Sequence, residues 1–155
     1  LKKVKRIGAS ESRQSFMGSD FSYSDLDPVD NNKYNFKMLP EVKDAEASYY
    51  VIQATAKSKS EKERTGYKKT VHYVRKDNFL ITRSIFWSLD GKTNKFLKVN
   101  KFISMNNVLI PTETIMVTKV GGRFEHKTVM VLSDVDNKTK IPANLFSKRN
   151  LEKGI

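Results

Sequence analysis

The chain has few residues that could do chemistry, and the first group lies in SRQSFMGSDFSYSDLD, residues 12–27. Gly18, Ser19 and Asp20 offer a hydroxyl beside a carboxylate, but a catalytic serine also needs a base and oxyanion donors. The segment lacks the G-x-S-x-G pattern of a nucleophile elbow. Ser19 is explained without chemistry as the N-cap of a short helix over residues 19–26, with Asp20 in its first turn. We therefore predict that the protein is not an enzyme.

Metal binding is the second chemistry to consider, because the chain has two histidines and a group of acidic residues. His72 and His126 both fall in expected strands, and neither has the neighbouring ligands that a zinc site needs. The acidic group lacks the D-x-[DN]-x-[DN]-G spacing and the distal glutamate of a calcium loop. Its members are Asp20, Asp25, Asp27 and Asp30. We predict no metal and no cofactor.

Charge is the strongest feature of the composition. The 155 residues include 29 Lys and Arg against 17 Asp and Glu, which gives a formal net charge of +12. Such a charge favours anionic partners such as nucleic acid, lipid headgroups or an acidic protein, but it also simply keeps a chain soluble. The cations are spread along the whole sequence and no nucleic-acid-binding motif accompanies them. We predict that the protein does not bind nucleic acid.

The elements that must position any site are mainly strands. Segments rich in β-formers alternate with turn pairs such as Asp90-Gly91, for which a type I′ turn is expected, Asn106-Asn107 and Gly121-Gly122. Such short connections allow only antiparallel pairing. The expected strands lie in 46–56, 67–76, 79–89, 93–105, 108–120 and 123–135. We predict a mainly β fold, a curved antiparallel meander with one or two short helices.

The remaining segments are less regular. YNFKML, residues 34–39, alternates like a strand and is expected to end at Pro40, while the charged run 57–66 reads as a flexible connection. Pro111 falls inside a strand pattern, which predicts an edge position or a bulge. Pro142 is a plausible start for one or two short helical turns that end near Leu151.

The opening segment carries a resemblance to a known family. LKKVKRIGASESRQSFMGSDFSYSDL, residues 1–26, resembles the outer-membrane lipoprotein-sorting protein family, the LolA-like group of bacterial envelope proteins. A basic strand of the form L-x-x-V-x-R-I is followed there by a serine-rich link and then by the motif S-F-M-G-S-D-F-x-Y-x-D-L. The matching residues are Ser15, Phe16, Met17, Gly18, Ser19, Asp20, Phe21, Tyr23, Asp25 and Leu26. Similarity in the later strands is looser.

The resemblance implies a half-open β-barrel in which helices lie against a concave face, with an acyl chain or other lipid held between them. It also implies a periplasmic location and, for some members, association with transporters of the resistance-nodulation-division type. Apolar strand residues would line the cavity, and Phe16, Met17 and Phe21 would insert toward it as a lid or plug. The expected lining residues are Val71, Tyr73, Phe86, Ile115, Val117, Val129 and Val131.

Two functions follow from these expectations. The first is a non-enzymatic carrier or sensor of lipid or lipoprotein in the periplasm, since burial of an acyl chain needs apolar area rather than reactive groups. The second is an interaction module that docks on an envelope transporter. The same apolar face would be ordinary core if a helix filled it permanently, and that reading stays open at this point.

The resemblance covers only the later part of a family member. We therefore expect residues 1–155 to be the C-terminal part of one LolA-like domain, with a signal peptide and further strands upstream of Leu1. A sheet that lacks its first strands leaves an edge unpaired, and unpaired edges promote association. We predict a homo-oligomer formed through that edge or by exchange of LKKVKRI, residues 1–7.

Overall fold

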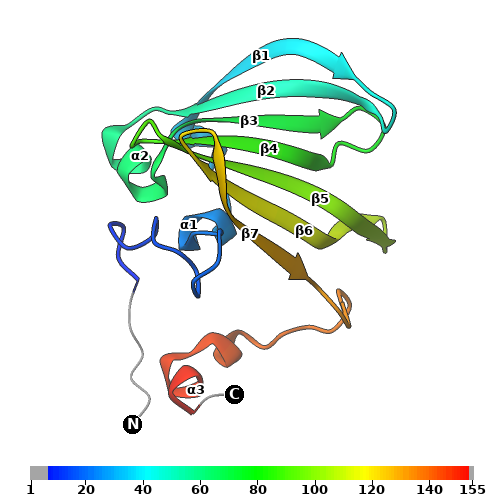
Figure 1. Cartoon of the computed structure of the whole chain (residues 1–155). Helices are drawn as coiled ribbons and strands as arrows, with labels where there is room; N and C mark the ends of the chain where they lie inside the picture. The colour runs from blue at the N-terminus through cyan, green and yellow to red at the C-terminus, as the bar shows by residue number, and fades with distance from the viewer. Residues whose placement is uncertain (1–6, 154–155) are drawn as a thin grey trace.

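Seven segments rich in β-formers pair in chain order to give one antiparallel sheet, β1-β2-β3-β4-β5-β6-β7 (Figure 1). The structure is a computed structural model and describes residues 7–153. The mainly β fold and the curved meander predicted from the sequence are confirmed. The strands are β1 Tyr34–Lys43, β2 Ser48–Ala56, β3 Tyr67–Arg75, β4 Ile81–Ser88, β5 Thr93–Met105, β6 Val108–Val120 and β7 Arg123–Val131. The helices are α1 Tyr23–Leu26, η1 Asn31–Lys33, α2 Lys59–Thr65, η2 Ala143–Phe146 and α3 Lys148–Lys153.

Tight turns set the register of the longest hairpins. Asn106 and Asn107 both have positive φ, as do Gly121 and Gly122, which suits the primed turns that follow the right-handed twist of a hairpin. The type I′ turn expected at Asp90-Gly91 is wrong, because within this pair positive φ is confined to Gly91. The Asp90 carboxylate instead accepts hydrogen bonds from the backbone N–H groups that follow it.

The two proline interruptions of the strand pattern have different outcomes. The strand expected to end at Pro40 continues to Lys43, because β1 is an edge strand and the register shifts between Leu39 and Val42. The prediction for Pro111 is confirmed in its bulge form. It pairs with Phe102 beside a register shift at which Thr112 of β6 is the extra residue.

The charged run 57–66 was expected to be a flexible connection, and this expectation is wrong. It contains α2, whose N-cap Ser58 accepts a hydrogen bond from the backbone N–H of Glu61 at 3.1 Å. Gly66 ends the helix in the left-handed conformation with φ 76°, a geometry that glycine adopts without strain.

The opening segment folds as a tight hairpin followed by a single helical turn. Met17 and Gly18 both have positive φ, and the backbone N–H of Phe16 donates to the carbonyl of Phe21 at 2.7 Å. The helix is shorter than expected and starts later. Its N-cap is Ser22, not Ser19, because the Ser22 and Asp25 side chains form a reciprocal capping box.

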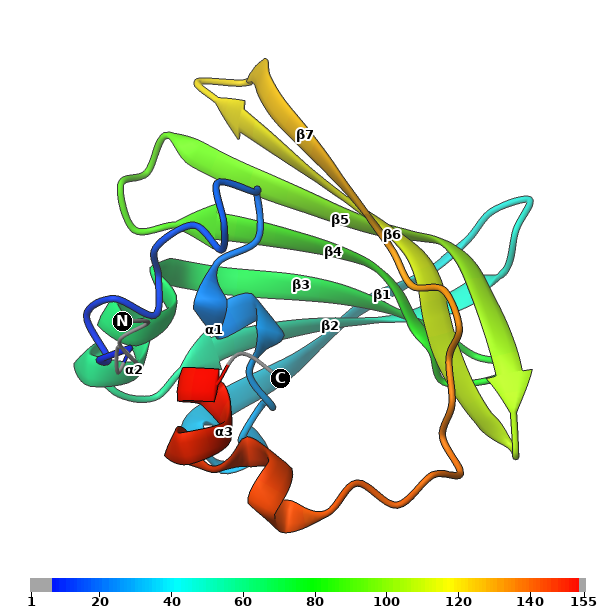
Figure 2. The same cartoon turned by 90° about the horizontal axis from the view of Figure 1, so that it is seen from below.

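The sheet is curved, and the chain covers one end of its concave side. Figure 2 shows α1 lying against this concave side, while α2 closes the same end between β2 and β3. The C-terminal segment runs away from β7 to η2 and α3, with Pro142 as the N-cap of η2. Residues 1–6 of the expected basic strand lie outside the described residues.

Candidate functional site

The concave side of the sheet contains a cavity of about 710 Å³. Its wall is formed by β1 to β6, together with residues from α1, η1, α2 and the loop between α1 and η1. Volumes between 300 and 1,000 Å³ are usual for ligand sites that bury most of a small molecule. Size and position make this cavity the candidate functional site.

Strand alternation decides which side chains enter the cavity. The pairing registers place Met38, Ile52, His72, Ser84 and Leu97 in one row across β1 to β5, and all five line the cavity. Since side chains alternate along a strand, every second residue of these strands faces the same way. The residues that form the cavity floor are therefore determined by the pairing register of the strands as well as by the sequence.

A second row gives the floor its apolar character. Phe36, Ala54, Thr70 and Phe86 follow one another across β1 to β4 and also line the cavity. Phe36 belongs to the edge strand and is 52% exposed, so it forms part of an open lip. The cavity is thus a half-open apolar trough.

His72 is a polar residue near the middle of this floor. Its Nδ1 lies 2.8 Å from Ser84 Oγ and its Nε2 lies 3.0 Å from Thr70 Oγ1. Burial lowers the pKa of the His72 imidazole below its ordinary value of 6.5, because desolvation disfavours the cation. The side chain is therefore neutral at pH 7 and does not supply a positive charge to the cavity.

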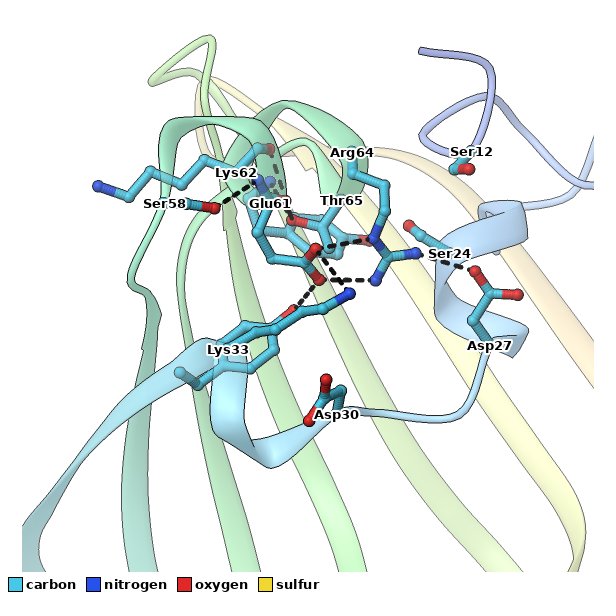
Figure 3. A network of polar contacts seen from close by, with 12 residues as sticks. Ser12, Ser24, Asp27, Asp30, Lys33, Ser58, Glu61, Lys62, Arg64 and Thr65 are labelled. Atoms are coloured by element: carbon cyan, nitrogen blue, oxygen red, sulfur yellow. Dashed lines mark hydrogen bonds and ion pairs between the residues drawn. The ribbon is translucent and has the colours of Figure 1, made fainter. Parts of the chain in front are cut away.

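A partly buried ion-pair network closes the α2 end of the cavity (Figure 3). Arg64 lies between Glu61, at 2.8 Å, and Asp27, at 2.9 Å, and so joins α2 to the loop that follows α1. Tyr34 donates a hydrogen bond to Glu61 at 3.0 Å, and Lys33 lies 3.6 Å from the same carboxylate. The network holds three separate segments at one end of the trough.

The pKa values in this network follow from its contacts. Hydrogen bonds from Arg64 lower the pKa of Glu61, although burial opposes the shift. Burial, and then the hydrogen bond to Glu61, raise the pKa of Tyr34 to about 12. Glu61 is thus a charged, nearly buried carboxylate whose side chain is 6% exposed, and it depends on its partners for solvation.

Asp25 ties α1 to the sheet beside this network. Tyr67 of β3 donates to both carboxylate oxygens of Asp25, at 2.8 and 3.0 Å, and Lys95 of β5 lies 3.8 Å away. Burial, and then the negative charge of Asp25, raise the pKa of the Tyr67 phenol well above its usual range. The phenol therefore stays protonated and keeps its hydrogen-bond donor.

Asp20 fixes the hairpin of the opening segment against β6 and β7. Its carboxylate accepts hydrogen bonds from Thr118 at 2.6 Å and Thr128 at 2.7 Å, and it lies 2.8 Å from Nδ1 of His126. Its backbone N–H donates to Thr128 Oγ1 at 2.9 Å. Burial raises the pKa of Asp20, but the hydrogen bonds outweigh burial and the pKa falls below 3.8. Asp20 thus acts as a structural clamp.

The expected lid residues do not enter the cavity. Met17 lies at the tip of the hairpin and is 85% exposed, and Phe16 packs edge-to-face on Tyr23 with ring centroids 5.4 Å apart. Phe21 is buried, yet it is not among the cavity-lining residues. Within the matching residues of the opening segment, Asp25 alone lines the cavity. Gly18 and Ser19 form the turn, and Leu26 ends α1.

Most of the expected lining residues lie on the other face of the sheet. Phe86 lines the cavity. Register pairs Val71 with Ile85 and Tyr73 with Arg83, which places them opposite the row that contains His72. Strand alternation assigns the same convex face to the residues expected from β6 and β7, which do not line the cavity: Ile115, Val117, Val129 and Val131.

Several residues of the site were missed by sequence reasoning. The network of Glu61 and Arg64 falls in the run read as flexible, although Ser58 followed by Glu61 three residues later matches the serine-to-acid spacing of a helix N-terminus. The spacing of Ser58 and Glu61 could therefore have predicted the start of α2. The partners Asp27 and Tyr34 carry no such local signal, because tertiary folding brings them to Arg64 and Glu61.

The acidic residues grouped in the sequence are separated in the structure. Asp20 contacts β6 and β7, Asp25 contacts β3, and Asp27 contacts α2. In the part of the chain that the structure describes, no three His, Cys, Asp or Glu side chains are placed to hold a metal ion. Within residues 7–153, no helix has the length and hydropathy of a membrane span.

Comparison with known proteins gives a family and a fold. Residues 1–153 match the model of a family described as "Uncharacterized protein". No curated protein matches the chain. A solved domain described as that of an outer membrane lipoprotein-sorting protein from Vibrio parahaemolyticus is similar, with a TM-score of 0.78 and 23% identity over 97% of this chain and 62% of that chain.

Two further structures agree with this likeness. A DUF1329 family protein from Desulfovibrio piger has a TM-score of 0.78 at 23% identity, over 92% of this chain and 57% of that one. A LolA superfamily protein from Nitrosomonas europaea has a TM-score of 0.69 at 22% identity, over 90% of this chain and 60% of that one. The chain thus spans about three fifths of the length of these structures, and it shares their fold.

Proposed function

The chain belongs to the family whose model its residues 1–153 match, and from its LolA-like fold we propose that it is a non-enzymatic carrier or sensor of lipid or lipoprotein. It would hold an acyl chain in the cavity on the concave side of its sheet. We place this activity in the periplasm, the compartment that the family resemblance implies. The observation that carries the proposal is the half-open apolar trough of about 710 Å³.

Energetics support an acyl ligand. Burial of each methylene contributes about 0.8 kcal/mol, so about a dozen methylenes contribute roughly 10 kcal/mol before the entropic cost of binding. The lip of the trough keeps apolar side chains exposed, with Phe36 at 52% and Met38 at 57%. A bound acyl chain would cover this surface.

Binding of cis-parinaric acid, a fluorescent fatty acid, tests the proposal. Wild-type protein should bind the probe, and native mass spectrometry should detect lipid that co-purifies with it. Phe36→Asp places a charge on the exposed lip and should weaken binding about tenfold or more, because it removes apolar contact and adds a charge that the chain must desolvate.

A matched control uses the other edge of the sheet. Val131 lies on β7, is 65% exposed and does not line the cavity, so Val131→Asp should bind the probe like wild type. Failure of the wild-type protein to bind the probe, together with no co-purifying lipid, would reject the function.

The alternative function, docking on an envelope transporter of the resistance-nodulation-division type, is not favoured by any observation on the site. The ion-pair network, the Asp25 contacts and the Asp20 clamp all link parts of this chain to one another. We therefore propose no transporter partner.

A further inference from the structure

The otherwise apolar centre of the cavity floor carries three polar side chains. Thr70, His72 and Ser84 form one hydrogen-bonded chain, Thr70 Oγ1 to His72 Nε2 at 3.0 Å and His72 Nδ1 to Ser84 Oγ at 2.8 Å. Ile52 and Leu97 flank this polar triad in the same row of the sheet. A polar group in such surroundings is costly unless it is hydrogen-bonded.

The polar triad has more hydrogen-bond donors than it has hydrogen bonds between its members. Each hydroxyl carries one O–H donor, and a neutral imidazole carries one N–H donor, which makes three donors. The triad contains two hydrogen bonds. One donor is therefore left over for either tautomer of His72, and it needs an acceptor from outside the triad.

Burial decides which hydroxyl holds the extra proton. If Nδ1 carries the imidazole proton, it donates to Ser84 and leaves the Ser84 proton unused, although Ser84 is only 3% exposed. If Nε2 carries it, Ser84 donates to Nδ1 and the free proton belongs to Thr70. Both hydroxyls line the cavity, but Thr70 is half-buried whereas Ser84 is almost fully buried, so the second arrangement places the free proton on the more accessible hydroxyl.

We propose that the Thr70 hydroxyl donates this hydrogen bond to the ester or amide carbonyl of a bound acyl lipid, so that the polar triad selects carbonyl-linked chains over plain ones. This inference rests on the proposed function and specifies its ligand class. A carbonyl oxygen fits because it is a neutral acceptor, and it lies at the start of an acyl chain whose remaining atoms are apolar.

The position of the polar triad also orients the lipid. Tyr67 and Val74, both in β3, lie on opposite sides of Thr70 in the sequence, and a strand rises about 3.3 Å per residue. The charged end of the cavity at Tyr67 and Asp25 is therefore within about 10 Å of Thr70 along β3, and it would receive the headgroup. The acyl chain would extend past Val74 toward Ile81 and Pro111.

Two matched lysolipids provide the test. 1-Palmitoyl-lysophosphatidylcholine and 1-O-hexadecyl-lysophosphatidylcholine share headgroup and chain length, and they differ in the carbonyl oxygen. Wild-type protein should bind the ester about three- to tenfold more tightly than the ether, the worth of one hydrogen bond. Binding is measured below the critical micelle concentration by displacement of cis-parinaric acid.

Substitutions in the polar triad separate carbonyl recognition from acyl binding. The triple variant Thr70→Val, His72→Leu, Ser84→Ala removes all three donors, and replacement of a whole polar network by apolar groups is compatible with folding. This variant should bind the two lysolipids with equal affinity, and its affinity for the ether lysolipid should match that of the wild type. Thr70→Ser keeps the hydroxyl and should retain the ester preference. The ¹⁵N spectrum of His72 should show the proton on Nε2.

The outcomes are distinct. Equal binding of ester and ether by the wild type, or an ester preference that survives in the triple variant, would overturn the role of the polar triad and leave the lipid-binding function intact. A wild-type protein that binds neither lysolipid and does not bind cis-parinaric acid would refute the proposed function and this inference with it.

Discussion

Asp20 shows how one carboxylate can hold a segment in place. It is 6% exposed and accepts hydrogen bonds from Thr118 and Thr128 at 2.6 and 2.7 Å, in addition to its contact with His126. An ionised carboxylate can accept several hydrogen bonds at once, whereas an amide loses acceptor capacity and adds donors. The ionised form of Asp20 is therefore the one that the folded hairpin requires.

We expect Asp20→Asn to lower the free energy of unfolding by about 1–3 kcal/mol, because the buried amide offers one acceptor oxygen instead of two and cannot accept from all three partners, the half-buried Thr118 and Thr128 and the exposed His126. The pKa of Asp20 is lower in the folded state than its ordinary 3.8, so its stabilising contribution is complete above about pH 4. It is lost as the pH falls from about 4 through the folded pKa. Urea unfolding of wild type and variant between pH 2 and 7 measures both effects.

Asp134→Asn is the matched control. Asp134 is exposed and has φ 53°, a conformation that asparagine tolerates, so the substitution should leave stability unchanged. If Asp20→Asn unfolded at the same urea concentration as wild type throughout this pH range, the clamp would not be a significant source of stability.

For single residues, the sequence predicted the secondary structure in which a residue lies better than the side chains that it contacts. His72 and His126 were assigned to strands, and these assignments are confirmed. The contact between Asp20 and His126 joins residues 106 positions apart. Local pattern carries no information on such a contact, because the curvature of the sheet brings the two together.

Among the elements, α2 depends most on contacts outside itself. It has seven residues, and isolated helices shorter than about 12 residues are marginal in water. Its stability must come from caps and tertiary contacts. The pairing of Glu61 with Arg64, Tyr34 and Lys33 supplies these contacts within the described residues.

We expect Arg64→Met to lower the free energy of unfolding by about 2–3 kcal/mol, because it leaves the nearly buried Glu61 carboxylate without its main donor. Glu61→Gln should cost less, since the amide still accepts from Tyr34. The double variant should cost less than the sum of the two, because no unpaired charge remains. Denaturant unfolding of all four proteins completes the cycle.

Lys59 and Glu63 form a comparison pair on the same helix. Their ion pair is exposed, with Lys59 at 90% and Glu63 at 57%, and such pairs contribute little. Lys59→Met should therefore leave the unfolding midpoint unchanged. Additive effects of Arg64→Met and Glu61→Gln would show that the network does not act as a unit.

The sequence also shows why α2 was missed and the strands were not. β5 and β6 match their expected ranges, because alternation and Asn or Gly turn pairs are strong local signals. The run 57–66 has six charged residues and no apolar periodicity, so it resembles a solvated linker. The helix forms because Ser58 caps its start, Gly66 caps its end, and Glu61 is paired through tertiary contacts.

For the whole molecule, the unpredictable feature was which face of the sheet is concave. In β3, Val71 and Tyr73 alternate with His72 and Val74, so both faces contain apolar residues. Curvature and the docking of α1 make the face of His72 the cavity wall, and neither is encoded in the alternation itself. The sequence thus predicted a curved sheet and an apolar site, but it placed most of the lining on the wrong side.

The two edges of the sheet differ in how well they resist pairing with another chain. β1 carries Pro40 and a bulge, and prolines and bulges protect edges. The second half of β7, residues 128–131, has neither charge nor proline, and Val129 and Val131 are 45% and 65% exposed. Within the described part of the chain β7 pairs with β6 alone. We therefore expect β7 to be the edge that associates.

Two copies of the chain should pair through β7 at high concentration, since an isologous contact uses the same strand of both copies. Sedimentation of the wild type should give an average mass that rises with concentration. Val131→Lys should reduce this rise, because a lysine on an edge opposes strand addition. Val42→Lys, on the protected edge and 39% exposed in the wild type, should behave like wild type. A wild-type mass that stays monomeric up to millimolar concentration, or an equal effect of both lysines, would exclude association through β7.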